Sequence, residues 1–214
     1  MPLGRSRGCA LPGGPGLVVL TVAVTLSMAC DARAQASPAE LIAAMQAGGT
    51  VVFLRHAATH QHEIDTGRLG DRAGQRNLSA AGIRQAEALG RAFRALGIPL
   101  DPILASPVFR ARDTAELAFG ADRVEVSMDI VADDYAGGRA AAMVDATRRL
   151  LRTPPEPGTN RLLIGHRTPL QMATRRGFPD SVLPEGAMAV FEPGGDEGRL
   201  LGTLTADQLI AAAP

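Results

Sequence analysis

The sequence predicts a three-layer α/β/α sandwich with a largely parallel central sheet. Three observations support this fold class. From residue 50 onward, short apolar runs alternate with longer segments of helical periodicity, as in α/β proteins. The chain has 214 residues, 46% hydrophobic and 21% charged, which suits one globular domain with a sizeable core. Two of the apolar runs end in histidine, and in α/β proteins functional groups lie at strand ends.

Six segments have the length and apolar content of strands. They are residues 50–54, 102–105, 123–127, 161–164, 187–191 and 200–204. Helix-length segments separate most of them, which favours parallel pairing with crossover connections.

Four internal segments are expected to be helices, namely residues 79–96, 107–119, 139–151 and 168–176. Ser79 stands where an N-cap belongs and Gly97 where the first helix should end. The apolar stripe of this helix, which should cover the sheet, consists of Ile83, Ala86, Leu89, Phe93 and Leu96. Thr205 and Gln208 have the spacing of a capping box and predict a last helix that runs through Ala213.

The amino terminus has the pattern of an export signal. Arg5 and Arg7 precede an apolar stretch at 17–29, which is short for a bilayer span, and Ala32-Arg33-Ala34 is a small-x-small cleavage site. We expect a signal peptide at residues 1–34 and a domain at 35–214 that is periplasmic or secreted, with no stable membrane span after processing. An uncleaved anchor or a buried helix is the alternative.

Both cysteines, Cys9 and Cys30, lie in this leader. Cys30 follows a degenerate lipoprotein signal, so a lipid anchor at Cys30 is the minority alternative. The processed domain would contain no thiol, which excludes disulfides and a cysteine nucleophile.

The charge balance gives no support for nucleic-acid binding. The formal net charge is zero, all 22 basic residues are arginine, and no basic run with interleaved aromatic residues is present. The oligomeric state is not predicted by any feature of the sequence.

Charged and titratable residues follow three of the apolar runs. Arg55 and His56 end the first, Arg110 stands just past the second, and His166 ends another. Because the carboxyl ends of neighbouring parallel strands share one edge, these four side chains are expected to form one pocket. Backbone N–H groups at the helix start near Ser106-Pro107 should add to its attraction for anions.

The chain contains four motifs, one after another, that resemble those of the histidine phosphatase superfamily. This superfamily includes the cofactor-dependent phosphoglycerate mutases. They are Leu54-Arg55-His56-Ala57-Ala58-Thr59; Asn77-Leu78-Ser79-Ala80-Ala81-Gly82 with Gln85-Ala86; Ser106-Pro107 with Arg110-Ala111 and Thr114-Ala115; and Gly165-His166. They occur in the family order between residues 50 and 166, and the resemblance implies a phosphoglycerate mutase-like fold.

The resemblance also implies a mechanism. His56 would attack phosphorus and become phosphohistidine, with its second ring nitrogen held by a backbone carbonyl. Arg55, Arg110 and His166 would bind the non-bridging phosphoryl oxygens, and Thr59 would help to position phosphate. Neither a metal nor another cofactor is needed.

The general acid is the least specific part of the resemblance. The family has a glutamate four positions before a glycine, and here Asp133 precedes Gly137 at that spacing. Asp133 is the first candidate, Asp134 the next, and Glu63 or Asp65 would follow if neither acts.

Two further positions depart from family patterns. Ala57 stands where glycine is usual, which would disturb the site only if the backbone there needed positive φ. Arg167 follows His166, where the acid phosphatase and phytase branch has an aspartate, so that branch is a poor match.

The polar segment 57–77 predicts a substrate-facing loop. His60 and His62 within it could be half of a metal site, but the spacing matches no known zinc hydrolase motif. Arg112, two positions from Arg110, is expected on the solvated face of its helix.

The sequence therefore predicts an exported phosphatase that hydrolyses phosphomonoesters through His56. The alternatives are a phosphohistidine or phosphoramidate phosphatase, a non-catalytic phosphate-binding envelope protein and a metal-dependent hydrolase. The expected substrate is a small phosphorylated molecule or a phosphorylated envelope glycan, and nothing in the sequence selects among these.

Overall fold

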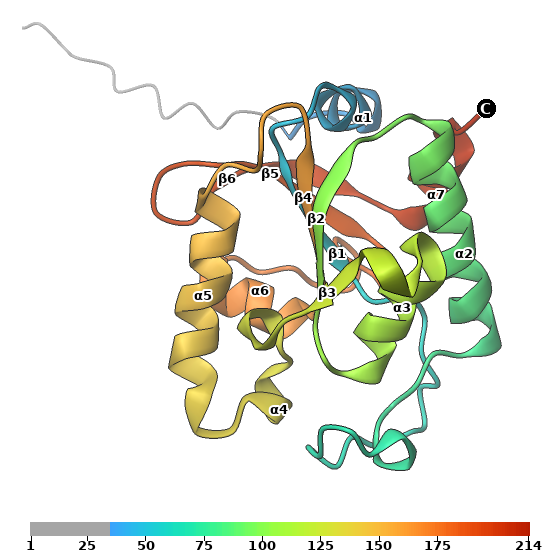
Figure 1. The fold of residues 1–214 in the computed structure, drawn as a ribbon, viewed down its shortest axis with the longest axis vertical. Coiled ribbons are helices and arrows are strands. Elements are labelled where there is room, and N and C mark those ends of the chain that lie inside the picture. Colours follow the sequence, from blue (N-terminus) through green and yellow to red (C-terminus); the bar gives the residue numbers. More distant parts are fainter. Residues whose placement is uncertain (1–34) are drawn as a thin grey trace, which may run out of the picture. The chain divides into compact units, whose positions relative to one another are not determined.

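The structure is a computed structural model that describes residues 35–214. The expected signal peptide, its expected cleavage site and Cys30 lie outside the described residues. Residues 35–214 form three layers, a central sheet with helices on both faces (Figure 1). This confirms the predicted fold class.

The six strands are arranged in the order β3-β2-β4-β1-β5-β6. Their bounds are β1 Val51–Arg55, β2 Leu100–Ala105, β3 Val124–Val126, β4 Asn160–Gly165, β5 Met188–Glu192 and β6 Arg199–Leu204. The neighbours β3, β2, β4 and β1 pair in parallel, whereas β5 is antiparallel to both β1 and β6. The sheet is thus largely parallel, and β1 and β4 lie side by side at its centre, so their carboxyl ends meet at one edge.

Seven α-helices are present in the described part of the chain. They are α1 Pro38–Ala47, α2 Ala80–Ala95, α3 Phe109–Phe119, α4 Asp133–Ala136, α5 Ala140–Arg152, α6 Arg167–Thr174 and α7 Ala206–Ala212. Figure 1 shows α2, α3 and α7 on one face of the sheet and α5 with α6 on the other. Short 3-10 turns connect several of these elements.

Each face of the sheet has its own apolar core, and β1 contributes to both. Val52 and Leu54 belong to the cluster under α1, α2, α3 and α7, whereas Val51 and Phe53 belong to the cluster under α5 and α6. Successive strand residues point to opposite faces, so a strand covered on both sides is apolar at every position. All five residues of β1 are buried, and the first four form a continuous apolar run, which ends at Arg55.

Two predictions from the sequence were incomplete or wrong: α1 was not predicted, and the expected core-facing stripe of α2 wrongly included Ile83. Ser37 and Glu40 form a capping box at the start of α1, with Pro38 in its first turn, a signal that the sequence carried. Ile83, expected to face the core, is 40% exposed, because the closely packed Gly82 faces inward in its place. The N-cap at Ser79 and the capping box of Thr205 with Gln208 are confirmed.

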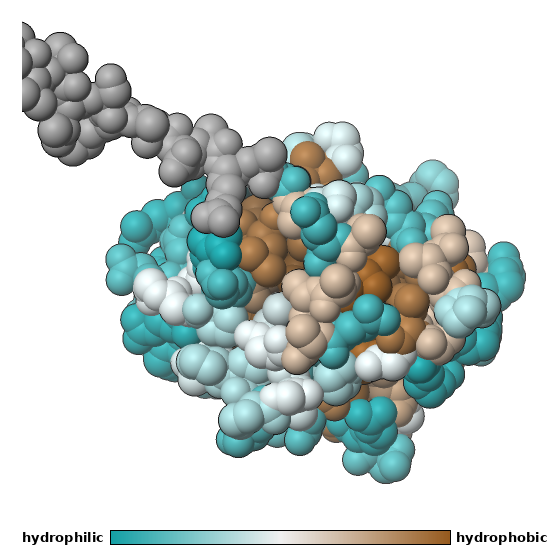
Figure 2. All heavy atoms as spheres, turned by 90° about the horizontal axis from the view of Figure 1, so that it is seen from above, coloured by the Kyte–Doolittle hydropathy of each residue, from teal (hydrophilic) through white to brown (hydrophobic). Residues whose placement is uncertain are grey.

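Figure 2 views the amino-terminal edge of the parallel strands, where apolar side chains reach the surface between hydrophilic ones. At this edge the buried Asn160 is fully hydrogen-bonded, accepting from Thr50 and donating to two backbone carbonyls. The chemically active groups lie at the opposite edge.

None of the helices between residues 35 and 214 combines the length and hydrophobicity needed to cross a bilayer.

Candidate active site

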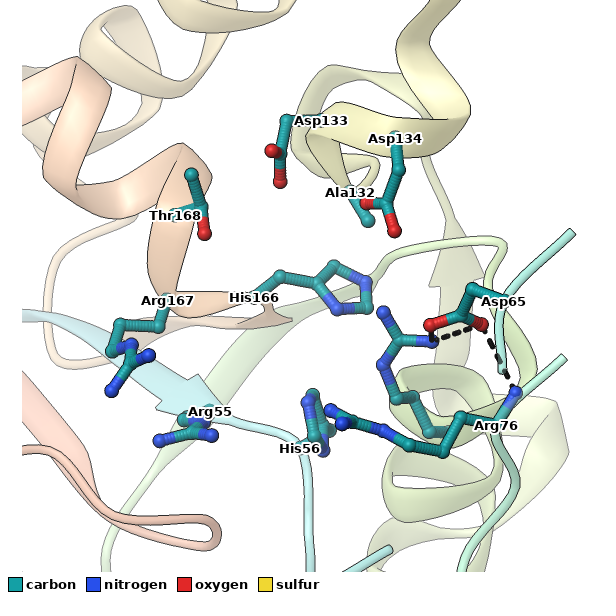
Figure 3. A pocket seen from close by; sticks show the side chains of 11 residues that line it. Arg55, His56, Asp65, Arg76, Ala132, Asp133, Asp134, His166, Arg167 and Thr168 are labelled. Atoms are coloured by element: carbon teal, nitrogen blue, oxygen red, sulfur yellow. Dashed lines mark hydrogen bonds and ion pairs between the residues drawn. The ribbon is translucent and has the colours of Figure 1, made fainter. Parts of the chain in front are cut away.

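A pocket of about 390 Å³ opens at the carboxyl ends of β1, β2 and β4 (Figure 3). Its lining residues are Arg55, His56, Asp65, Arg76, Arg110, Ala132, Asp133, Asp134, His166, Arg167 and Thr168. The four side chains expected to converge from the sequence, Arg55, His56, Arg110 and His166, all line it. Four arginines line it, and guanidinium groups suit an anionic ligand.

His56 follows the last residue of β1 and is 3% exposed. Its Nδ1 lies 2.9 Å from the carbonyl oxygen of Ala57. A carbonyl oxygen only accepts hydrogen bonds, so Nδ1 carries the proton, and in the neutral ring Nε2 keeps its lone pair. This is the tautomer that a nucleophilic imidazole requires.

The surroundings of His56 keep its ring neutral. Burial, followed by the positive charge of Arg110, holds its pKa well below the ordinary value of 6.5, and Arg55 and Arg76 act in the same direction. At neutral pH the ring therefore has a lone pair available for attack.

Arg55 and Arg110 bring two guanidinium groups to the pocket. Arg55 is 8% exposed, and its Nη1 donates to the carbonyl oxygen of Leu183 at 2.8 Å and to Asp180 at 2.5 Å. Arg110, in the first turn of α3, is 4% exposed and donates to both carboxylate oxygens of Asp65, at 3.0 and 3.1 Å. Both cations are thus anchored at one end.

His166 follows β4, and its ring centroid lies 5.4 Å from that of His56. Its Nε2 lies 2.9 Å from Oγ of Ser106. Burial and then the charge of Arg110 keep the pKa of His166 well below 6.5, so this ring is also neutral. If the Ser106 hydroxyl donates to Nε2, then Nδ1 carries the proton and can donate to a ligand.

Within residues 35–214, four buried side-chain nitrogens have no protein group as hydrogen-bond partner. They are Nε of Arg55, Nε of Arg76, Nε of Arg110 and Nδ1 of His166. All four belong to residues that line this pocket. Buried donors without a partner are costly, and the arginine Nε–H groups are donors in any state. Their concentration around His56 marks a site that an oxyanion would complete.

Asp133 and Asp134 begin α4 and line the pocket. In Figure 3, His166 lies between these two aspartates and His56. Burial raises the pKa of Asp133, and the neighbouring charge of Asp134 acts in the same direction. A raised pKa favours the protonated form that a general acid needs. Asp133 therefore lies in the pocket wall, and its role as general acid stays a prediction.

The other two acid candidates are engaged elsewhere. Burial would raise the pKa of Asp65, but hydrogen bonds from Tyr135 and the backbone N–H of Arg76, together with the charge of Arg110, outweigh it and lower this pKa. Asp65 is therefore a poor proton donor and instead holds Arg110. Glu63 does not line the pocket, and its carboxylate accepts from the backbone N–H of Asn77.

Two arginines that the sequence did not assign to the site also line it. Arg76 lies at the end of the polar loop, and Arg167 directly follows His166. Arg76 approaches Glu185, with Nη2 3.8 Å from Oε1. Since Arg76 stands immediately before Asn77 of a family motif, its position was the available signal.

Thr59 was expected to help position phosphate, but it does not line the pocket. Its hydroxyl and its backbone N–H both donate to Glu185, at 2.7 and 3.1 Å. Glu185 also lies 3.9 Å from Arg55, so Thr59 helps to position the carboxylate behind the arginines. Its place does not support direct contact with substrate.

The backbone donors expected near Ser106 are occupied. The N–H of Ser106 donates to the carbonyl of Ile164, that of Val108 to Oγ of Ser106, and that of Phe109 to the side chain of Gln75. At these three positions the expected free N–H groups are absent, because a carbonyl of β4 and the side chains of Ser106 and Gln75 accept from them.

Ala57 is compatible with the site. Its φ is not positive, its N–H donates to Thr114, and its methyl group is buried with Leu78 and Ala86. The replacement of glycine therefore needs no strained backbone.

The polar loop contributes Asp65 and Arg76 to the pocket, as expected of a substrate-facing segment. His60 and His62 are exposed and line none of the pockets described here. In the described part of the chain, no group of three or more His, Cys, Asp or Glu side chains is placed to hold a metal ion. Arg112 lies on the solvated face of α3, where it pairs with Glu116, as predicted.

Comparison with known proteins agrees with the geometry. The model of the histidine phosphatase superfamily (branch 1) matches residues 51–149. The protein histidine phosphatase SixA complexed with tungstate is 17% identical, with a TM-score of 0.51 over 75% of this chain and 99% of that one. Phosphoserine phosphatase from Entamoeba histolytica, in complex with 3-phosphoglyceric acid, is 14% identical, with a TM-score of 0.50 over 75% and 98%. At these identities the likeness establishes the fold.

No curated protein sequence matches the chain. The family match begins at β1 and includes His56, Arg110 and Asp133, and the fold then brings His166 to the same pocket. Residues 51–149 belong to the histidine phosphatase superfamily, and the protein is a histidine-type phosphatase, a hydrolase of phosphoric monoesters.

Proposed function

We propose that this protein hydrolyses small phosphomonoesters outside the cytoplasm, through a phosphohistidine formed on Nε2 of His56. The observation that carries the proposal is a neutral, correctly protonated imidazole surrounded by buried nitrogen donors that have no partner within the described residues. Such a site is preorganised for a phosphoryl group whose negative charge must be stabilised during transfer.

In the first step, Nε2 of His56 forms a bond to phosphorus while the bond from phosphorus to the ester oxygen breaks. The leaving oxygen takes the proton of Asp133. Arg55, Arg110 and Nδ1–H of His166 donate to the non-bridging oxygens, and the phosphorylated ring keeps its proton on Nδ1, facing Ala57.

In the second step, the carboxylate of Asp133 removes a proton from water as its oxygen attacks phosphorus. The phosphorus–nitrogen bond breaks, inorganic phosphate leaves, and His56 returns to its neutral form. The proton that Asp133 gave to the alcohol is thus replaced from water, and the enzyme is unchanged.

Ester cleavage is favoured over phosphoramidate cleavage by one observation. An alcohol is a poor leaving group without a proton, and Asp133 lines the pocket with a raised pKa. A phosphohistidine substrate would depend less on this acid.

The nucleophile is tested by trapping. The protein is incubated with a 32P-labelled phosphomonoester, quenched in alkaline detergent, and examined for label that survives base and is lost in acid. We expect this label in the wild type and none in His56→Ala. Turnover of p-nitrophenyl phosphate should fall on the order of 1,000-fold or more in that variant, with an unchanged circular dichroism spectrum.

His60→Ala, which removes an exposed imidazole of the adjacent loop, is the matched control and should keep turnover. A His56→Ala variant that retains more than a tenth of the activity contradicts the proposed nucleophile. If no phosphate ester or phosphoramidate is turned over while inorganic phosphate binds, the protein is a phosphate-binding protein instead. Activity that a chelator removes would favour the metal-dependent alternative.

Export rests on the sequence of the leader alone. We expect the protein recovered from the periplasm or medium to begin near Gln35, which mass spectrometry of the intact protein would measure. A protein that begins at a lipid-modified Cys30 would instead be anchored to a membrane.

A further inference from the structure

Asp180 places a carboxylate at the mouth of the pocket. Its Oδ1 lies 2.5 Å from Nη1 of Arg55 and 2.7 Å from Nη1 of Arg167. The side chain is nevertheless 69% exposed. One carboxylate oxygen at the surface therefore contacts two cations of the pocket wall.

The two arginines depend on this contact to different degrees. Arg55 is only 9% exposed at its side chain and keeps a separate hydrogen bond to the carbonyl of Leu183. The Arg167 side chain is 29% exposed, and Asp180 is its charged partner. Since exposed ion pairs contribute little net stability, another anion can replace Asp180 here at small cost.

A second cavity adjoins the first at this point. It measures about 320 Å³ and is lined by Arg55, Gln61, Arg76, Arg167, Asp180, Pro184 and Glu185. Arg55, Arg76 and Arg167 line both cavities. A substrate whose phosphoryl group lies at His56 therefore has room to extend past Arg167.

The proposed chemistry gives Arg167 no task at the phosphoryl group, where Arg55, Arg110 and His166 supply the donors. The Arg167 guanidinium lies beyond the reacting centre and already binds the carboxylate of Asp180. Such a group is suited to bind a carboxylate or a similar oxyanion of a ligand.

We propose that Arg167 binds a second anionic group of the substrate, in the place that the carboxylate of Asp180 takes in the free protein. This inference rests on the proposed function and names its substrate class. The preferred substrates are phosphomonoesters that carry a carboxylate or a second phosphate a few bonds from the ester oxygen. Asp180 is a built-in competitor, and a bound substrate displaces it from Arg167.

The test compares pairs of substrates that differ by one anionic group. O-Phosphoserine and O-phosphoethanolamine differ by a carboxylate, and the bisphosphate of 1,3-propanediol differs from its monophosphate by a second phosphate. We expect the wild type to favour the anionic member by about tenfold or more in kcat/KM. The pair with the larger ratio identifies the kind of oxyanion.

Arg167→Gln should lower this ratio by about tenfold, because it removes the cation and leaves a shorter, uncharged polar side chain. Asp180→Asn should lower KM for the anionic members by several fold, because the competing carboxylate is gone. Arg112→Gln, which removes an arginine from the solvated face of α3, is the matched control and should leave the ratio unchanged.

A wild-type ratio of kcat/KM near one overturns the inference. So does an Arg167→Gln variant in which kcat/KM falls equally for both members of a pair. An increase in KM for the anionic members in Asp180→Asn would show that Asp180 positions the arginines and does not compete, which also overturns it. These outcomes require an active enzyme. Failure to turn over any ester would instead overturn the proposed function, and this inference with it.

Discussion

At the residue scale, the position of a histidine in the fold decides its chemistry. His56 and His166 are buried beside Arg110, and both have a pKa well below 6.5, whereas His60 and His62 are exposed on the neighbouring loop. Burial and nearby cations disfavour the charged ring. The protein thereby keeps a nucleophilic nitrogen at neutral pH within a pocket that is otherwise rich in cations.

Replacement of Asp133 tests the general acid. Asp133→Asn should lower kcat/KM for an alkyl phosphate about 100-fold or more, because the alkoxide must then leave without a proton. The loss on p-nitrophenyl phosphate should be several times smaller, since nitrophenolate is a good leaving group. Steady-state kinetics on the two esters measures the difference.

Asp134→Asn is the matched control, because Asp134 also begins α4 and lines the pocket. A larger effect in this variant would transfer the role to Asp134. An equal loss on both esters in Asp133→Asn would mean that Asp133 acts by positioning and does not protonate the leaving group.

The residues that sequence reasoning missed are those without a motif of their own. Arg76, Asp180 and Glu185 have their places in the site through contacts with residues distant in sequence, such as Asp180 with Arg55. Single arginines and acids in polar loops are too common to be assigned from local pattern. Asp65 was considered as an acid, but only its contacts with Arg110 and Tyr135 indicate that it positions an arginine.

At the element scale, the close packing of α2 against α3 depends on a glycine. A Cβ on Gly90 would lie 2.0 Å from the carbonyl oxygen of Ala118, a backbone atom of α3. The two helices must separate to admit it. We expect Gly90→Ala to lower the free energy of unfolding by about 1–3 kcal/mol, despite the better helix propensity of alanine. Urea denaturation measures the change.

Gly138→Ala serves as the control, because a Cβ there meets no atom within 4 Å and its φ is not positive. That variant should be neutral or slightly more stable. An equally stable Gly90→Ala variant would mean that α2 and α3 can separate without loss of packing.

Strand and helix positions were largely predictable because their patterns are local. The six strands occur where apolar runs indicated them, and the boundaries differ by a residue or two. The short α4 was not foreseen, since a four-residue helix has too few turns to show a period. Its contribution is to point Asp133 into the pocket.

At the scale of the whole molecule, the two buried imidazoles couple stability to pH. Their pKa values are lowered by folding, so below pH 6.5 the unfolded chain takes up protons that the folded protein does not. The free energy of unfolding should therefore decrease as the pH falls. Lowering the pH from 7.5 to 5.5 should cost roughly 2–3 kcal/mol from the two groups. Urea denaturation at both pH values measures it.

The raised pKa of Asp133 opposes this trend, so variants must be compared with the wild type. His166→Asn should lose about half of the pH dependence, whereas His60→Gln, at an exposed position, should keep all of it. An unchanged dependence in His166→Asn would show that this ring is protonated in the folded protein.

By itself, the sequence determined the fold class, the family and the positions of Arg55, His56, Arg110 and His166 at strand ends. These follow from periodicity, burial and ordered motifs, which act over short stretches of chain. The tertiary structure alone decided which nitrogens remain without partners, which carboxylates hold which arginines, and that Asp180 bridges Arg55 and Arg167. Such pairings depend on distances between side chains far apart in sequence, and no local pattern encodes those distances.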